Sequence, residues 1–262
     1  MFNILFGFIA GSIGGSVATA VADRYQQPHA FVLGRSQCPH CHMTLRWFEL
    51  LPIVSWLTQH GQCRSCQWPI GWAVLAVELV SGLIGLLVVA RLFGTGHFEP
   101  SASNLILGFF GWCSLIGLGA LTLTDLTDQQ LPDRLMIGTL PFLVVLGWAI
   151  PTLHLTASSA LLGSAVGGGF LGLLWLGTKG RGIGLGDVKL LAALGLAIGY
   201  PLILVALFVA FIGGGAWSGV LLATGRAKFD GQTRVAFGPF LMAGYIVALL
   251  AGRSLLAWFG LV

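Results

Sequence analysis

The hexapeptide GLGDVK, residues 184–189, places one carboxylate, Asp187, between two glycines and a lysine at the start of an apolar run. A carboxylate is costly to bury at the edge of hydrocarbon, so such a residue in a membrane protein predicts a functional site. Gly184 and Gly186 have no side chains, which lets another backbone or a substrate strand come close. The plain alternative is a glycine-rich turn in which Asp187 caps a helix. A second carboxylate is needed to decide between these interpretations.

The composition around this motif is that of a membrane protein. Of 262 residues, 56% are hydrophobic and 8% are charged, and mean hydropathy is +0.90, whereas soluble domains have about 25% charged residues. No basic stripe with interleaved aromatic residues occurs, so nothing indicates nucleic-acid binding. Eight apolar segments predict an all-α polytopic fold with about eight transmembrane helices: 2–22, 71–93, 103–124, 135–151, 158–177, 187–199, 201–223 and 239–260.

Positive charge gathers in alternate loops, at 23–70, 125–134, 178–186 and 224–238. Of the 13 Lys and Arg residues, all but Arg91 and Arg253 lie in or next to these loops. The positive-inside rule therefore predicts that these loops are cytoplasmic and that both termini lie outside. The sixth segment, 187–199, gives only about 20 Å of helix against a hydrocarbon core of about 30 Å. We therefore expect a water-accessible recess at Asp187.

Small residues recur in the predicted helices at the spacing that lets two helices pack closely. Such residues allow close backbone approach without a hydrophobic driving force. The sequence therefore predicts close helix contacts at three sets of glycines: Gly7, Gly11 and Gly15; Gly163 and Gly167; Gly215 and Gly219.

The first predicted cytoplasmic loop contains two CxxC pairs, Cys38 with Cys41 and Cys63 with Cys66, separated by 21 residues. Two thiolate pairs at such spacing can complete a tetrahedral zinc site, and four thiolates leave no open position for water. The pattern predicts a structural zinc that folds a loop with too little apolar surface for its own core. Two disulfides or redox-active thiols are the alternative, which a cytoplasmic location disfavours. His40 and His42 are competing ligands, although solvated loop histidines are the simpler interpretation.

A second group of carboxylates lies at TDLTDQQLPD, residues 124–133, on the same predicted side as Asp187. Asp125 is closest to the hydrocarbon and is the best partner for Asp187. We expect Asp128 to be solvated and Asp133 to cap the next helix. Lys189 lies two residues after Asp187 and should point to another helix face.

Two carboxylates held together cannot both ionise easily, so one keeps a proton. This arrangement suits peptide hydrolysis, because one carboxylate accepts a proton from water while the other donates to the carbonyl and later to the leaving amine. Spacing alone leaves open that Asp125 and Asp187 are two unrelated helix-end aspartates.

With Asp125, Asp187 and the four cysteines, the chain resembles the type IV prepilin peptidases, bifunctional leader peptidases and N-methyltransferases of the GxGD aspartyl protease group. The resemblance covers about residues 15–244. Its most specific segments are RSQCPHC (35–41), LPIVSW (51–56), GQCRSC (61–66), DLTDQQLPD (125–133), GLGDVKLLAA (184–193) and FGPF (237–240). It implies that Asp125 and Asp187 carry out hydrolysis and that the four cysteines bind zinc. Gly184, Gly186 and Lys189 belong to the matching second catalytic segment.

The resemblance also implies substrates and a location. The family cleaves prepilins or pseudopilins after a short basic leader at the cytoplasmic face of the bacterial inner membrane. It then methylates the new N-terminus with S-adenosylmethionine. The sequence has no glycine-rich dinucleotide-type fingerprint that would identify a cofactor site, so no methyl-transfer residues are assigned. Local pairing is the favoured role of the two candidates, Glu49 and Glu78.

The predicted organisation has three parts: a first helix at 1–22, a cytoplasmic zinc-binding loop at 23–70 associated with methyl transfer, and a transmembrane peptidase domain at 71–262 with seven further helices. Two other function classes stay open. A proton-coupled transporter would use the same two aspartates as a relay, although no inverted repeat or pair of broken helices supports it. A zinc-bearing assembly scaffold would have no catalysis.

Overall fold

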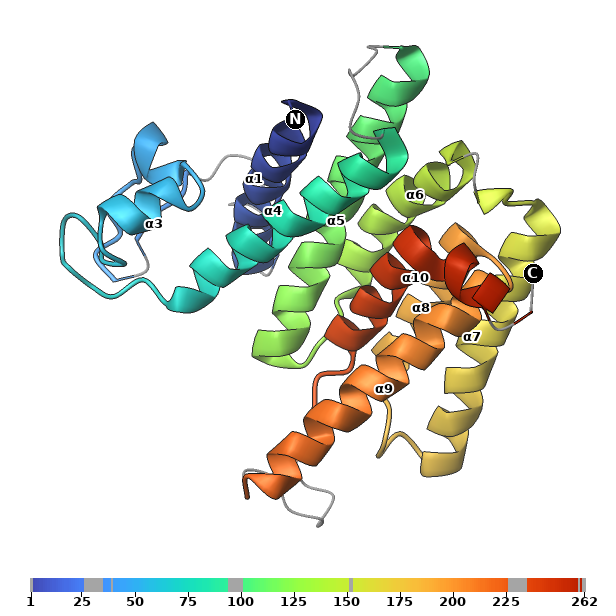
Figure 1. Cartoon of the computed structure of the whole chain (residues 1–262). Coiled ribbons are helices and arrows are strands. Elements are labelled where there is room, and N and C mark those ends of the chain that lie inside the picture. The colour runs from blue at the N-terminus through green and yellow to red at the C-terminus, as the bar shows by residue number, and fades with distance from the viewer. Residues whose placement is uncertain are drawn as a thin grey trace. The chain divides into compact units, whose positions relative to one another are not determined.

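The computed structural model describes residues 2–25, 35–38, 40–93, 101–150, 153–225, 235–258 and 260. Three of the basic residues predicted to be cytoplasmic, Arg226, Lys228 and Arg234, lie outside the described residues. The described chain is helical (Figure 1), with the elements α1 (Phe2–Arg24), η1 (Trp47–Leu50), α3 (Val54–Thr58), α4 (Trp72–Phe93), α5 (Ala102–Asp128), α6 (Asp133–Ala149), α7 (Ala157–Thr178), α8 (Leu185–Ile198), α9 (Leu202–Ala223) and α10 (Gly238–Trp258).

The long helices coincide with the eight predicted apolar segments, which confirms the all-α membrane fold. Six described helices are long and apolar enough to cross a membrane: α1, α4, α5, α7, α9 and α10. The other two are shorter, with 17 residues in α6 and 14 in α8. The length problem expected at the sixth segment is therefore present in the structure.

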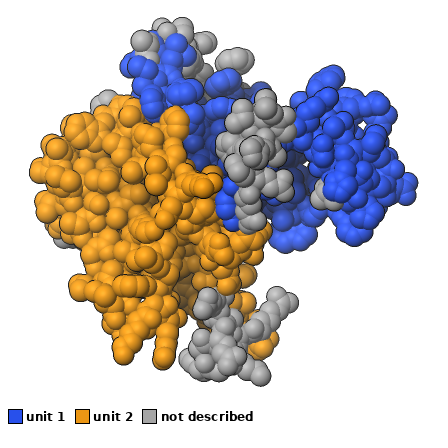
Figure 2. Space-filling model, turned by 180° about the vertical axis from the view of Figure 1, so that it is seen from behind, with its two compact units in different colours: residues 1–123 blue, residues 124–262 orange. Residues whose placement is uncertain are grey.

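Residue contacts divide the chain into two compact units, residues 1–123 and residues 124–262 (Figure 2). Helix α5 begins in the first unit, and its last turn, from Thr124, belongs to the second. The cysteine pairs are in the first unit and the aspartates are in the second. Each unit can therefore be described by its own helices.

In the first unit, α1 and α4 lie side by side (Figure 1) and pack through small residues. A Cβ atom built on Gly7 would lie 2.8 Å from the backbone oxygen of Gly85, and one on Gly15 would lie 2.8 Å from Ser81 Oγ. Side chains larger than glycine would force these two helices apart. The predicted close contact of the first helix is confirmed.

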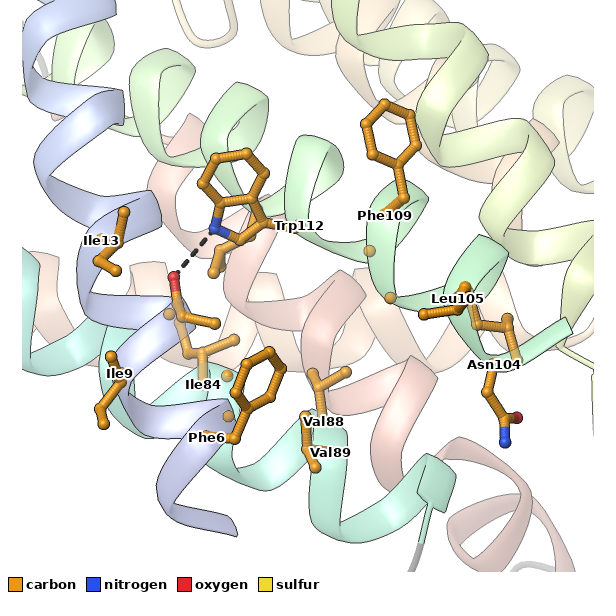
Figure 3. Close-up of a pocket in the computed structure, with 18 residues that line it drawn as sticks. Phe6, Ile9, Ile13, Ile84, Val88, Val89, Asn104, Leu105, Phe109 and Trp112 are labelled. Atoms are coloured by element: carbon orange, nitrogen blue, oxygen red, sulfur yellow. Dashed lines mark hydrogen bonds between the residues drawn. The ribbon is translucent and has the colours of Figure 1, made fainter. Parts of the chain in front are cut away.

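The first unit also has an apolar pocket of about 600 Å³ lined by α1, α4 and α5. Figure 3 shows Phe6, Ile84 and Val88 lining it, and Trp112 donating its indole N–H to the backbone oxygen of Ala10 over 2.9 Å. Its 18 lining residues include no titratable side chain. This pocket therefore offers no group for acid–base chemistry.

In the second unit, α8 is the central helix. Leu190, Leu191, Leu194 and Ala197 are at most 1% exposed, and α8 contacts α6, α7, α9 and α10. Its backbone touches that of α7, because a Cβ on Gly163 would lie 2.6 Å from the Gly195 oxygen. Surrounding helices shield α8 from lipid, so a helix too short to span the bilayer is tolerated there. The close contact predicted at Gly163 is confirmed.

The contact predicted at Gly215 and Gly219 of α9 is wrong within the described structure, because a Cβ on either glycine would meet nothing within 4 Å. The glycines of α9 that do pack are Gly213 and Gly214, whose added Cβ atoms would lie about 3 Å from the rings of Phe240 and Phe237. The spacing of small residues identified the helix but not which of its faces meets a neighbour.

Candidate functional site

Asp125 lies in the last turn of α5 and is 6% exposed. Its Oδ2 accepts a hydrogen bond from the backbone N–H of Gly238, the first residue of α10, over 2.9 Å. This bond fixes one carboxyl oxygen of Asp125 between α5 and α10. The two bonded residues are 113 positions apart in sequence.

Asp187 lies in the first turn of α8 and is 8% exposed. Its Oδ2 accepts the backbone N–H of Gly184 over 3.2 Å, and the N-terminal position on α8 favours negative charge. Its Oδ1 is buried and has no hydrogen-bond partner in the described part of the chain. Its charge interacts with that of Asp125. The second unit therefore brings the two predicted aspartates together, with one carboxyl oxygen of Asp187 left unpaired.

Three glycines make room for this carboxyl pair. A Cβ on Gly238 would lie 2.7 Å from Asp125 Oδ2, and one on Gly184 would lie 3.2 Å from Asp187 Oδ2. A Cβ on Gly186 would lie 3.0 Å from the Cβ of Leu131. Gly186 therefore lets the segment that follows Asp125 lie against the start of α8. These contacts give a physical reason for the glycines around Asp187.

The other predicted residues of this region have separate roles. Lys189 Nζ lies 2.9 Å from both carboxyl oxygens of Asp133, and the two side chains are 45% and 59% exposed. The prediction that Asp133 caps the fourth long helix is wrong, because Pro132 occupies the N-cap and Asp133 lies inside the first turn, paired with Lys189. Asp128 is exposed, as expected. Lys189 therefore joins α8 to α6 and makes no bond to Asp187.

In the first unit, the four predicted metal ligands form one cluster. The Sγ atoms of Cys38, Cys41, Cys63 and Cys66 all lie within 4.8 Å of one another. Cys38 and Cys66 Sγ are 3.8 Å apart, and Cys41 and Cys63 Sγ are 4.0 Å apart. A tetrahedral zinc with Zn–S bonds of about 2.3 Å requires sulfurs about 3.8 Å apart. The donor set therefore fits zinc in both chemistry and size.

Each CxxC pair adopts the same turn. The N–H of Cys38 donates to the oxygen of Met43 over 3.0 Å, and that of Cys63 donates to the oxygen of Trp68 over 2.8 Å. Residues at equivalent positions, His42 and Gln67, have a φ of 57°. The backbone N–H of Cys41 acts most strongly to lower the pKa of the Cys38 thiol to about 7. Cys38 can therefore supply a thiolate, the form that binds metal, near neutral pH, whereas desolvation and the neighbouring thiols raise the pKa of Cys66.

His40 and His42 do not join the cluster. His40 is exposed and stacks on Trp68, with ring centroids 4.3 Å apart, and His42 is also exposed. Among the described residues, the group able to hold a metal consists of the four cysteines. The structure supports the prediction that His40 and His42 are solvated loop residues.

The two glutamates considered for methyl transfer differ in their surroundings. Glu49 accepts the backbone N–H of Arg46 over 2.7 Å at an exposed site. Glu78 is 4% exposed and accepts the backbone N–H of Ile53 over 2.7 Å. Glu49 makes the local pairing that the sequence favoured, whereas Glu78 pairs with a residue 25 positions away in sequence. Sequence reasoning nevertheless missed that Glu78 is buried, although a lone carboxylate in an apolar segment was the available signal.

Comparison with known proteins identifies the family. Residues 9–92 match the model of the bacterial peptidase A24 N-terminal domain, and residues 112–219 match that of the type IV leader peptidase family. The prepilin leader peptidase/N-methyltransferase of Bacillus subtilis (strain 168) is 33% identical over 260 residues, covering 99% of this chain and 98% of the relative. The chain belongs to the prepilin leader peptidase/N-methyltransferase family.

Other relatives with the same name agree. The Aeromonas hydrophila protein is 34% identical over 243 residues, which cover 89% of this chain and 77% of the relative. That of Burkholderia pseudomallei (strain 1026b) is 37% identical over 227 residues, covering 83% and 67%. No solved structure gives a significant match. Membership in this bacterial family of multi-pass aspartic peptidases confirms the resemblance and the enzyme class predicted from the sequence.

The two family matches separate the two sets of predicted residues. The N-terminal domain match contains the four cysteines, Glu49 and Glu78. The leader peptidase match contains Asp125, Asp187 and Lys189. Gly238, whose N–H holds Asp125, lies beyond both matched ranges. Gly238 stands within FGPF, and this motif alone does not indicate that its N–H meets Asp125.

Proposed function

We propose that this protein cleaves the short basic leader from type IV prepilins or pseudopilins and N-methylates the new N-terminus. The observation that carries the proposal is the pair of buried aspartates in one unit, Asp125 and Asp187, with Asp125 close enough to Asp187 for its charge to act there, in a chain of this family. Each is anchored through one oxygen by a backbone N–H, from Gly238 and Gly184 respectively. Such anchoring supports catalysis because it fixes the reacting groups before substrate binds.

In the proposed hydrolysis, the aspartates share one proton. The ionised carboxylate accepts a proton from water as the water oxygen attacks the scissile carbonyl carbon. The protonated carboxyl donates its proton to the carbonyl oxygen. Collapse of the tetrahedral intermediate breaks the C–N bond, and the leaving amine takes a proton from the pair. The unpaired Oδ1 of Asp187 is a suitable site for the attacking water.

The burial of the pair matches the kind of substrate proposed. A scissile bond at the start of a membrane helix must be reached by groups at the membrane edge. Asp125 in the last turn of a candidate span and Asp187 in the first turn of a short, enclosed helix meet this requirement. We propose that this edge faces the cytoplasm of a bacterial inner membrane, as the distribution of Lys and Arg predicts.

We further propose that the segment 23–70 contributes to methyl transfer and that its four cysteines bind zinc. A closed four-thiolate site has no open coordination position, so the ion would stabilise the loop and take no part in hydrolysis. S-adenosylmethionine, when bound, would supply the methyl group for the new amine.

Purified protein in liposomes, incubated with a model prepilin and S-adenosylmethionine, tests this function. Mass spectrometry should show loss of the leader and one added methyl group. The transporter alternative predicts an intact prepilin together with solute-dependent proton movement into the same liposomes. An intact prepilin without proton movement would favour the scaffold.

A further inference from the structure

A buried carboxylate in the first unit has no part in the proposed hydrolysis. Glu78 lies in the second turn of α4, inside the candidate span Trp72–Arg91, and is 4% exposed. An ionisable side chain inside a membrane-spanning helix is costly and is a functional-site candidate. Its contacts therefore indicate what it contributes.

Glu78 joins three segments of the first unit. Its Oε2 accepts the backbone N–H of Ile53 over 2.7 Å, and its carboxyl is hydrogen-bonded by the side chain of Ser16 on α1. Ile53 lies between the two cysteine pairs in sequence. One side chain on α4 thus holds both α1 and the metal-binding loop.

The backbone that Glu78 holds is strained. Ile53 has a φ of 64° and a ψ of −51°, which is a rare conformation for a β-branched residue. The N–H of Val54 donates to the oxygen of Pro52 over 2.6 Å, closing a three-residue γ-turn of the rarer hand. Such strain persists only when neighbouring contacts enforce it, and it is concentrated at functional sites.

The strained turn is linked to the metal cluster through Trp56. It starts α3, whose Trp56 donates its indole N–H to the oxygen of Ile70 over 3.3 Å. The same indole packs under Gly61, where a Cβ would lie 2.7 Å from the ring. Gly61 and Ile70 flank the second cysteine pair and are joined by a backbone hydrogen bond of 2.7 Å. A continuous set of contacts therefore runs from Glu78 through Ile53 and Trp56 to the cysteine cluster.

We propose that Glu78 is a positioning residue for methyl transfer, which fixes the metal-binding loop on α1 and α4 through its hydrogen bond to Ile53. The inference rests on the proposed contribution of this loop to methyl transfer. The contacts lie within the N-terminal domain match, whereas the aspartate pair lies in the other unit. Loss of Glu78 should therefore separate the two activities.

The test compares Glu78→Ala, Glu78→Gln and Glu49→Ala in one prepilin assay with S-adenosylmethionine. Glu49→Ala is the matched control, because Glu49 also accepts a loop N–H but at an exposed site. For Glu78→Ala we expect the methylated fraction of cleaved product to fall about tenfold or more, since the loop N–H loses its hydrogen-bond acceptor. Cleavage should stay near the wild-type rate, and Glu49→Ala should retain both activities.

Two further readouts distinguish positioning from other roles. Glu78→Gln keeps an acceptor oxygen for Ile53, so it should recover much of the methylation. Hydrogen–deuterium exchange of residues 47–58 should rise in Glu78→Ala and stay low in Glu49→Ala. An unchanged methylated fraction in Glu78→Ala, or equal losses of cleavage and methylation, would overturn the proposal. So would a Gln variant as inactive in methylation as the Ala variant, which would make the charge itself essential. Absence of both activities in the wild type would instead reject the proposed function.

Discussion

Replacing Gly238 with alanine should impair peptide cleavage while leaving the fold intact. The added Cβ would lie 2.7 Å from Asp125 Oδ2, whereas ordinary contact begins near 3.4 Å, so the oxygen must move by about 0.7 Å. The side-chain end can move at little cost to the fold, but the 2.9 Å bond from the Gly238 N–H is then lost or distorted. Misplacing a catalytic group by about 1 Å costs up to about 100-fold in rate. We therefore expect cleavage to slow about 10- to 100-fold, or about 1.4 to 2.7 kcal/mol in activation free energy.

The stability of this variant should fall, but by less than unfolds the protein. The backbone of Gly238 is outside the left-handed region, so alanine there has no positive-φ strain. A lost hydrogen bond to a carboxylate costs about 1.5–3 kcal/mol, and the first residue of a helix gains little helix propensity to offset it, so the free energy of unfolding should fall by no more than about 3 kcal/mol. Cleavage of a model prepilin and thermal unfolding are measured in parallel, with Gly215→Ala as the control because its Cβ would meet nothing within 4 Å. A Gly238→Ala protein that cleaves at the wild-type rate would refute the argued role of this contact.

Two other predictions concern residues around the sites. Lys189→Ala should slow cleavage less than about threefold and change unfolding free energy by less than about 1 kcal/mol, because its ion pair with Asp133 is exposed; a loss of several hundredfold would place Lys189 in catalysis. Replacing Cys38 and Cys41 together with serine removes two of four thiolates, so zinc per chain should fall and protease should cut residues 40–71 before the helices. Unchanged zinc content by metal analysis would count against the four-thiolate site.

The sequence predicted most of the fold because the physical signal in each helix is strong. Long apolar runs with few charges identified the helices, and glycines at regular spacing identified the α1 and α7 contacts. The same spacing failed at Gly215 and Gly219, because a pattern within one helix does not determine where its neighbour lies. Asp133 was misread for a related reason. Its position after Pro132 resembled a cap, but its partner, Lys189, is 56 residues away in sequence.

The sequence predicted which side chains form the candidate site, but it did not predict the backbone N–H groups that hold carboxylates in place. Asp125 and Asp187 were recognised because carboxylates at the ends of apolar segments are rare and costly. The N–H of Gly238 that holds Asp125, and the N–H of Ile53 held by Glu78, are backbone groups. A sequence motif does not record which backbone N–H points at a carboxylate, so these contacts emerge only from the three-dimensional arrangement.

The most direct test of the central claim is the leader-cleavage rate of Asp125→Asn, Asp187→Asn and the double variant, measured by mass spectrometry on one prepilin. Asparagine keeps the size of each side chain but cannot exchange the proton that hydrolysis requires. If the two carboxyls act as one unit, each single variant should lose about as much activity as the double variant. A single variant that still cleaves at close to the wild-type rate, while folded, would contradict the two-aspartate mechanism.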